Sequence, residues 1–199
     1  MNQTNAKSEA ELRSLVENAK ENEAKLQKFQ AVELSLIGAD SFSTLYQVLT
    51  SEYRRSFGLD RVVLTLVDLA HEIRRMIGEM RTPSEHFEQL RLVDPLDRSS
   101  HLSEICNGPV LRAYDDATDG WIFGQTWPTP ESVALLPLKR SGAVIGSLCL
   151  SSSDPNRFTS TKSTVFLSRL SAIAGICVEN TLNTHRLRNA GITDPLTGA

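Results

Sequence analysis

Two apolar runs in the C-terminal half of the chain, joined by four polar residues, constrain the fold most strongly. They are Val133–Leu138 and Ala143–Leu150, and Lys139-Arg140-Ser141-Gly142 separates them. A short polar loop that ends in glycine between two apolar runs is typical of a β-hairpin. Gly146 lies inside the second run, where it predicts a bulge or a close backbone approach. The pattern therefore predicts a pair of antiparallel strands.

A third apolar run, Arg61–Leu69, has the sequence RVVLTLVDL. Nearly continuous Val and Leu predicts a central strand that is buried on both faces. We interpret Glu72–Ile77 as a partner strand across a short turn. Residues 78–129 are rich in turn signals, and short strand or helix pieces are expected in them near Leu90–Val93 and Trp121–Phe123.

Helices are predicted on both sides of these strands. Phe42–Phe57 follows Ser41, a good N-cap residue, and precedes Gly58, a good C-cap residue. A longer helix is expected from Ser160 to Asn189, with one apolar stripe packed on the sheet and another on a partner helix. The first stripe is Phe166, Leu170, Ile173, Cys177, Asn180, Thr184 and Leu187, and the second is Leu167, Ala174, Val178 and Leu182.

The N-terminal segment, residues 1–37, also has the composition of a helix. Ser8–Lys28 is rich in Glu, Lys, Ala and Leu and contains no Pro or Gly. Its apolar positions alternate three and four apart, which predicts either an amphipathic helix on its own domain or a coiled-coil dimer. The seam consists of Leu12, Leu15, Ala19, Asn22, Leu26 and Phe29.

Charge and composition exclude several classes of function. The 199 residues include 21 basic and 24 acidic side chains, for a net charge of −3, so a nucleic-acid partner is not expected. No apolar run reaches the ~18 residues of a membrane span, and residues 1–11 show no signal-peptide pattern. Cys106, Cys149 and Cys177 form an odd, widely spaced set, which favours reduced thiols. A cytoplasmic protein is therefore expected, without a membrane.

The hairpin and the residues after it also follow a family pattern. Ala134-Leu135-Leu136-Pro137-Leu138, then Gly142 through Leu150, then Arg157-Phe158-Thr159 match P-L … G … I-G-x-L-x-L … F-T before a final helix. This order resembles the second half of GAF domains, and Ser132–Asn180 looks closest to a GAF-like proteobacterial group of unknown function. The resemblance implies an α+β fold: a GAF-like antiparallel sheet flanked by helices, with long N- and C-terminal helices and a sensory domain over residues 38–180.

A short motif near the C-terminus, at Asp194, Leu196, Thr197 and Gly198, resembles the start of the GGDEF domain of diguanylate cyclases. The resemblance implies that residues 181–192 are a linker helix and residues 193–199 the first part of a GGDEF domain. Such a domain uses Mg²⁺ and GTP, and two of them condense two GTP molecules into cyclic di-GMP. The chain itself has neither the G-G-[DE]-E-F run nor a P-loop, so we expect it to catalyse no reaction and to carry no cofactor.

A ligand pocket is expected among aromatic and polar residues of the irregular region. GAF sheets usually hold a small molecule between one face and the long loops. The side chains that could line such a site are Arg98, His101, Arg112, Tyr114, Trp121 and Phe123. The alternative is that Trp121 and Phe123 fill the pocket and leave the domain empty. A metal site is not expected, because the histidines lack ligand spacing.

Three functions remain after the sequence analysis. The leading hypothesis is a sensory module that forms a homodimer through its terminal helices and controls a GGDEF cyclase. Its signalling helix would use Phe166, Leu170, Ile173, Cys177, Asn180 and Leu187. The second is a structural dimer scaffold without a ligand. The third is a redox-active GAF enzyme, for which Cys106 is the candidate loop thiol.

Overall fold

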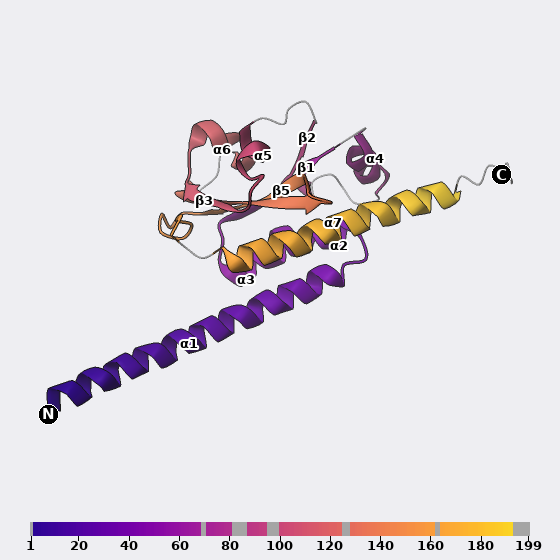
Figure 1. Ribbon diagram of the computed structural model, residues 1–199. Coiled ribbons are helices and arrows are strands. Elements are labelled where there is room, and N and C mark those ends of the chain that lie inside the picture. The colour runs from indigo at the N-terminus through magenta and orange to yellow at the C-terminus, as the bar shows by residue number, and fades with distance from the viewer. Residues whose placement is uncertain are drawn as a thin grey trace.

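The computed structural model of the chain has a central sheet between two layers of helices (Figure 1). It describes residues 2–68, 71–80, 87–94, 100–124, 128–161 and 164–192. Arg98 and the motif at Asp194, Leu196, Thr197 and Gly198 lie outside these residues.

The sheet has five strands in the order β2-β1-β5-β4-β3. They are β1 (Arg61–Val67), β2 (Leu90–Val93), β3 (Val110–Ala113), β4 (Ser132–Arg140) and β5 (Ala143–Ser152). β2 pairs with β1 in parallel, and every other pair is antiparallel. The hairpin and the central strand are thus confirmed, and so is the α+β fold class.

Gly146 is the point where the β4–β5 ladder becomes irregular. Leu138 pairs with Gly146 while Lys139 pairs with Val144, so Ile145 is the extra residue of a bulge. A side chain at Gly146 would collide with the backbone oxygen of Thr65 on β1. Both the bulge and the close backbone approach are therefore present.

The prediction of a strand at Glu72–Ile77 is wrong, because this segment lies in the helix α4 (Glu72–Glu79). The side chain of Asp68, at the end of β1, accepts hydrogen bonds from the backbone N–H of Ile73 at 2.8 Å and of Arg74 at 3.3 Å. These bonds satisfy N–H groups in the first turn and favour a helix. β1 pairs instead with β2 and β5.

The predicted helix at Phe42–Phe57 is present, with a π-helical turn in its middle. It consists of α2 (Phe42–Gln47), η1 (Val48–Glu52) and α3 (Tyr53–Phe57). The Ser41 hydroxyl caps its start by accepting from the Thr44 N–H at 3.2 Å. Gly58 ends it in the left-handed conformation, with φ 59°.

The long C-terminal helix is α7 (Val165–Ile192), which crosses the sheet on the side of α1 (Figure 1). It starts later than predicted, at Val165 instead of Ser160. Leu170, Ala174 and Val178 are buried against the sheet. The Ser171 hydroxyl donates to the Pro137 carbonyl.

By length and composition alone, Val165–Arg188 could cross a membrane. α7 packs on β4 through one apolar face. A helix that packs on a protein core can have the same length and composition as a membrane span.

The first predicted stripe of α7 meets the N-terminal helix of the same chain, α1 (Asn2–Ile37). Phe166 stacks on Phe29 with ring centroids 4.8 Å apart. Arg169 bonds to Glu33, with Nε 2.6 Å from Oε1. Cys177, Asn180 and Thr184 share a cleft with the end of α1. Leu170 belongs to the core instead, Ile173 packs at its edge, and Leu187 is exposed.

The first half of α1 extends away from the rest of the chain (Figure 1). Its seam residues Leu12 and Leu15 are 62% and 66% exposed. The interpretation of an amphipathic helix on its own domain therefore holds only for the second half, where Val32 and Leu36 are buried.

Ion pairs join α7 to α4 and to β4 at the end of the sheet. One edge of the Arg186 guanidinium donates two hydrogen bonds to the Glu72 carboxylate, from Nε at 2.6 Å and from Nη2 at 2.7 Å. These hydrogen bonds lower the pKa of Glu72. A second pair links Arg140 of β4 to Glu179 of α7 at 2.8 Å. We call the Glu72–Arg186 pair the α4–α7 clamp.

Candidate functional site

The sheet face opposite α7 carries a second, smaller core. Two short helices, α5 (Ser100–Glu104) and α6 (Asp116–Phe123), cover it (Figure 1). The buried members from α5, α6 and the adjoining turn are Leu102, Ile105, Ile122 and Phe123, and those from the strands are Val63, Val133, Leu135 and Cys149.

α6 is fixed at its start by two aspartates. Asp115 is its N-cap and accepts a hydrogen bond from the Ala117 N–H at 3.1 Å. The Asp119 carboxylate, which is fully buried, accepts from the Asp115 N–H at 3.0 Å. Local capping thus turns the carboxylate of Asp119 inward, toward β3.

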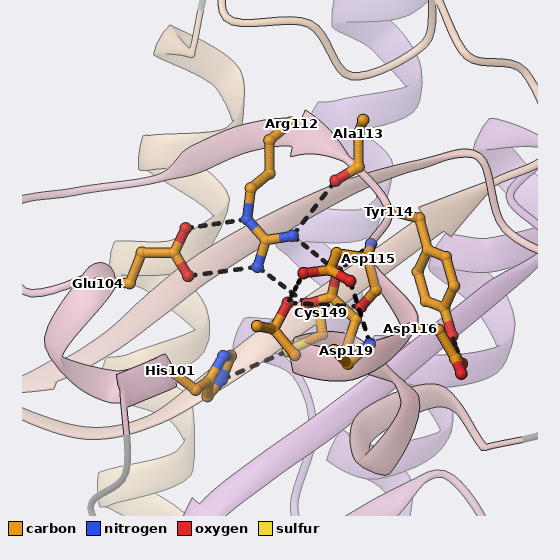
Figure 2. Close-up of polar contacts among 11 residues, drawn as sticks. His101, Glu104, Arg112, Ala113, Tyr114, Asp115, Asp116, Asp119 and Cys149 are labelled. Carbon is orange, nitrogen blue, oxygen red and sulfur yellow. Dashed lines mark hydrogen bonds and ion pairs between the residues drawn. The ribbon is translucent and has the colours of Figure 1, made fainter.

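Arg112 of β3 joins both covering helices (Figure 2). It donates two hydrogen bonds to Asp119, at 2.7 and 2.9 Å, and two to Glu104, at 2.9 and 3.3 Å. Hydrogen bonds to these two carboxylates raise the pKa of Arg112. Because both pairs engage the guanidinium, Arg112 positions α5 and α6 more than it offers a free cation to a ligand.

His101 of α5 is buried over β5. Its Nε2 lies 2.8 Å from the Ser147 hydroxyl. The same nitrogen lies 3.8 Å from the Cys149 thiol (Figure 2). Burial lowers the pKa of His101 and raises that of Cys149 to about 12. The imidazole is therefore neutral and the thiol protonated near pH 7.

Three predicted aromatic residues lie in the same layer. Trp121 is 43% exposed and meets His101 edge-on, with ring centroids 5.5 Å apart. Phe123 is fully buried and lies 6.3 Å from the Tyr114 ring. Burial, together with a hydrogen bond to Asp116, raises the pKa of Tyr114 to about 12. The structure thus brings His101, Arg112, Tyr114, Trp121 and Phe123 into one layer over the sheet.

Among the described residues, two hydroxyls on this face lack a hydrogen-bond partner of normal geometry, although the Thr65 hydroxyl lies close enough to the Cys149 thiol to affect its pKa. They belong to Thr65 of β1 and Ser151 of β5, which are both buried. Thr65 is paired directly with Ser147, so the two side chains lie on the same face beneath His101. An unsatisfied buried hydroxyl is unfavourable by about 1–3 kcal/mol, so the face retains unused hydrogen-bonding capacity.

The chemistry of this face is that of neutral hydrogen bonding. A neutral imidazole, hydroxyls and a protonated thiol can orient a small polar molecule. Within the described ranges, no group of three His, Cys, Asp or Glu side chains could hold a metal ion. Cys106 is exposed, whereas Cys149 is buried and protonated.

Sequence reasoning missed four residues of the site: Thr65, Glu104, Asp119 and Ser147. A signal for Thr65 and Ser147 was present, because they are polar residues inside otherwise apolar strands. The spacing of Glu104, Arg112 and Asp119 gave no such signal, since their contacts depend on how α5 and α6 fold over β3.

The arrangement of sheet and helices is that of a GAF domain. The chain is similar to the crystal structure of the GAF domain from Acinetobacter phosphoenolpyruvate-protein phosphotransferase, with a TM-score of 0.53 and 14% identity. The similarity covers 78% of this chain and 93% of that one. The chain has a GAF-like fold.

A family model narrows the assignment. Residues 1–181 match DUF484, described as a protein of unknown function, and the chain belongs to this family. No curated protein has a significantly similar sequence.

Proposed function

We propose that this chain is a regulatory sensory and dimerisation module that controls a downstream GGDEF diguanylate cyclase. The observation that carries the proposal is the placement of α7. This helix packs on the sheet through its first half and is held by the α4–α7 clamp near its end. A change at the sheet can therefore reach the end of the helix.

The path along α7 consists of close contacts. Ser171 bonds to the Pro137 carbonyl, and a Cβ at Gly175 would lie only 3.0 Å from the Lys139 oxygen. Helix and strand are thus in direct backbone contact, and a shift of β4 moves α7. Further along, the clamp links α7 to α4, whose first turn is fixed by Asp68 at the end of β1.

Dimerisation is the second part of the proposal. Leu12, Leu15 and Leu26 of the predicted seam are exposed on α1. A second copy aligned in parallel would bury this seam as a coiled coil. Two GGDEF domains must face each other to form cyclic di-GMP, so a dimer suits this output. Mg²⁺ and GTP would belong to that domain, and its substrate places the protein in the cytoplasm.

The sheet face under α5 and α6 is called the sensory face below. Whether it binds a ligand distinguishes the proposed sensor from a ligand-free scaffold. The unpartnered hydroxyls of Thr65 and Ser151 favour a bound polar molecule. The complete burial of Ile122 and Phe123 favours a ligand-free scaffold. The redox-active alternative rests on Cys106, which is exposed, because the thiol of Cys149 is buried and its pKa is raised to about 12.

The dimer is tested by sedimentation of the chain. Leu15→Glu places a charge on the seam and should shift the protein from dimer to monomer without loss of helical signal. Ser14→Glu adds the same charge on the same helix, off the seam, and should leave the dimer intact. A monomeric wild type, or equal behaviour of both variants, contradicts dimerisation through α1.

Control of the cyclase is tested in the longer protein that the proposal implies. Cyclic di-GMP formed from GTP and Mg²⁺ should change several-fold when Glu72→Gln opens the clamp. Glu88→Gln, an exposed site away from α7, should leave the rate unchanged. No product from a protein with an intact GGDEF motif, or no effect of Glu72→Gln, would reject the regulatory role.

A further inference from the structure

A groove of about 320 Å³ lies on the other side of the sheet from the candidate site. It opens between α1, α3 and the start of α7, helices that lie together in Figure 1. Its size falls at the lower end of the roughly 300–1,000 Å³ of small-molecule sites. The apolar side chains that shape it are Phe29, Phe57, Leu59, Leu150, Phe158 and Leu167.

Aromatic rings form one wall of this groove. Phe29 of α1 lies 4.4 Å from Phe57 and 6.3 Å from Tyr53, measured between ring centroids. Tyr53 and Phe57 are 4.5 Å apart. Such a wall favours the burial of a flat ring or a short hydrocarbon chain.

Tyr53 brings a polar atom into this apolar setting. The residue is only 2% exposed, and no partner among the described residues accepts or donates a hydrogen bond to its hydroxyl. Burial raises its pKa, so the hydroxyl stays protonated and can donate. A phenol in this position is suited to an acceptor atom of a ligand.

The charge of the groove is positive. Arg157 lines it and donates to the Phe57 carbonyl at 2.5 Å, while its guanidinium carbon lies 6.0 Å from the Phe158 ring centre. It forms no ion pair with any carboxylate of the described residues. Lys25 of α1 also lines the groove, and no acidic residue is among the described residues that line it. A partly buried guanidinium without a carboxylate favours an anionic ligand.

We propose that this groove binds a small amphipathic carboxylate, with its hydrocarbon part against the aromatic wall and its carboxylate between Arg157 and the Tyr53 hydroxyl. The site is separate from the sensory face and does not depend on the proposed function. Because Phe29 belongs to α1, a bound molecule would also strengthen the contact between α1 and the domain.

Calorimetry with decanoate tests the proposal on the whole chain, below the concentration at which the probe forms micelles. Decanol and decyltrimethylammonium have the same hydrocarbon chain with a neutral or cationic head. Decanoate should bind at least ten-fold more tightly than either. Absence of decanoate binding, or equal affinity for the three probes, overturns the proposal.

Substitutions then locate the site. Arg157→Gln should weaken decanoate binding about ten-fold or more while leaving decanol unchanged, and Tyr53→Phe should have a smaller effect in the same direction. Arg54→Gln on the exposed side of α3 removes an equal charge and should change nothing. Circular dichroism confirms that each variant is folded, and if Arg157→Gln is not, Lys25→Gln replaces it. Equal decanoate affinity in the folded variants and the wild type would overturn the proposal. So would an affinity that falls as protein concentration rises, because a second copy of the chain would then compete for the groove.

Discussion

The two faces of the sheet differ sharply in what they bury. Toward α7, the strands present the apolar side chains of Leu64, Leu66, Leu136 and Leu148. Toward α5 and α6, Thr65, Ser147 and Ser151 alternate with apolar residues beneath a buried His101. Both faces come from the same strands, because successive side chains point to opposite sides.

The difference suggests that the apolar face mainly stabilises the fold, whereas the polar face serves recognition. An apolar face stabilises the fold in proportion to the area it removes from water. A face with unpartnered hydroxyls lowers stability, so its polar groups are better explained by recognition of a molecule than by folding. Substitutions on the two faces should therefore have effects of different size and even of different sign.

The largest effect is expected at Leu170, in the apolar core. Leu170→Glu buries an unpaired charge and should lower the free energy of unfolding by about 4 kcal/mol or more. Ile176→Glu, on the exposed side of the same helix, should change it by no more than about 0.5 kcal/mol. Urea denaturation measures both. A stable Leu170→Glu protein would mean that this face meets a partner chain, not the sheet.

On the polar face, the largest effect is expected at Asp119. Asp119→Ala leaves Arg112 with Glu104 as its remaining carboxylate partner and removes the acceptor of the Asp115 N–H. Stability should therefore fall by about 2–3 kcal/mol. Asp116→Ala removes an exposed carboxylate from the same helix and should have an effect below about 1 kcal/mol. If thermal denaturation gives equal shifts, the Arg112 network does not hold α6 in place.

A smaller effect concerns pH. Burial lowers the pKa of His101, whereas an unfolded histidine titrates near ~6.5. Below this pH the unfolded chain binds more protons than the folded one, so stability falls as pH drops toward the folded pKa. Between pH 7.5 and 5.5 the wild type should lose up to about 1 kcal/mol more than His101→Gln. Urea denaturation of both proteins at the two pH values measures this difference, and an equal loss in the two proteins would contradict it.

The smallest effect should have the opposite sign. Thr65→Val replaces an unpartnered hydroxyl with a methyl group of similar size and should stabilise the protein by about 0.5–1 kcal/mol. Thr50→Val removes a buried hydroxyl that donates to the Tyr46 carbonyl at 2.8 Å. This control should destabilise the protein by about 1 kcal/mol. Destabilisation by Thr65→Val in chemical denaturation would show that its hydroxyl has a partner in solution.

Strands and helices with a clear period could be predicted from the sequence. The apolar pattern that predicts each of them lies within one continuous segment of the chain, as in the β4–β5 hairpin, β1 and the helices at both ends. The segment after β1 was misjudged because its helix depends on the Asp68 carboxylate, which precedes α4 in the chain. The parallel pairing of β1 with β2 was not anticipated either, since it joins residues separated by α4 and a loop.

The candidate site was predictable only as a region. Aromatic and polar residues indicated one segment, and five of them lie near one another over the sheet. That these residues bind a ligand stays a prediction. Their partners could not be inferred, because His101 of α5 contacts Ser147 of β5, and Arg112 of β3 contacts Asp119 of α6. Such contacts depend on tertiary folding, for which local spacing gives no rule.

The α4–α7 clamp has a consequence for rotation. Each residue of an α-helix turns the backbone by about 100° and advances it by ~1.5 Å. With Arg186 fixed by Glu72, a single residue inserted between Arg186 and Ile192 would turn everything beyond it by about 100° while the clamp stays closed. A seven-residue insertion would restore the original angle to within about 20°. The clamp thus fixes the rotation of α7 at Arg186, and the number of residues after Arg186 sets the orientation of the end of the helix.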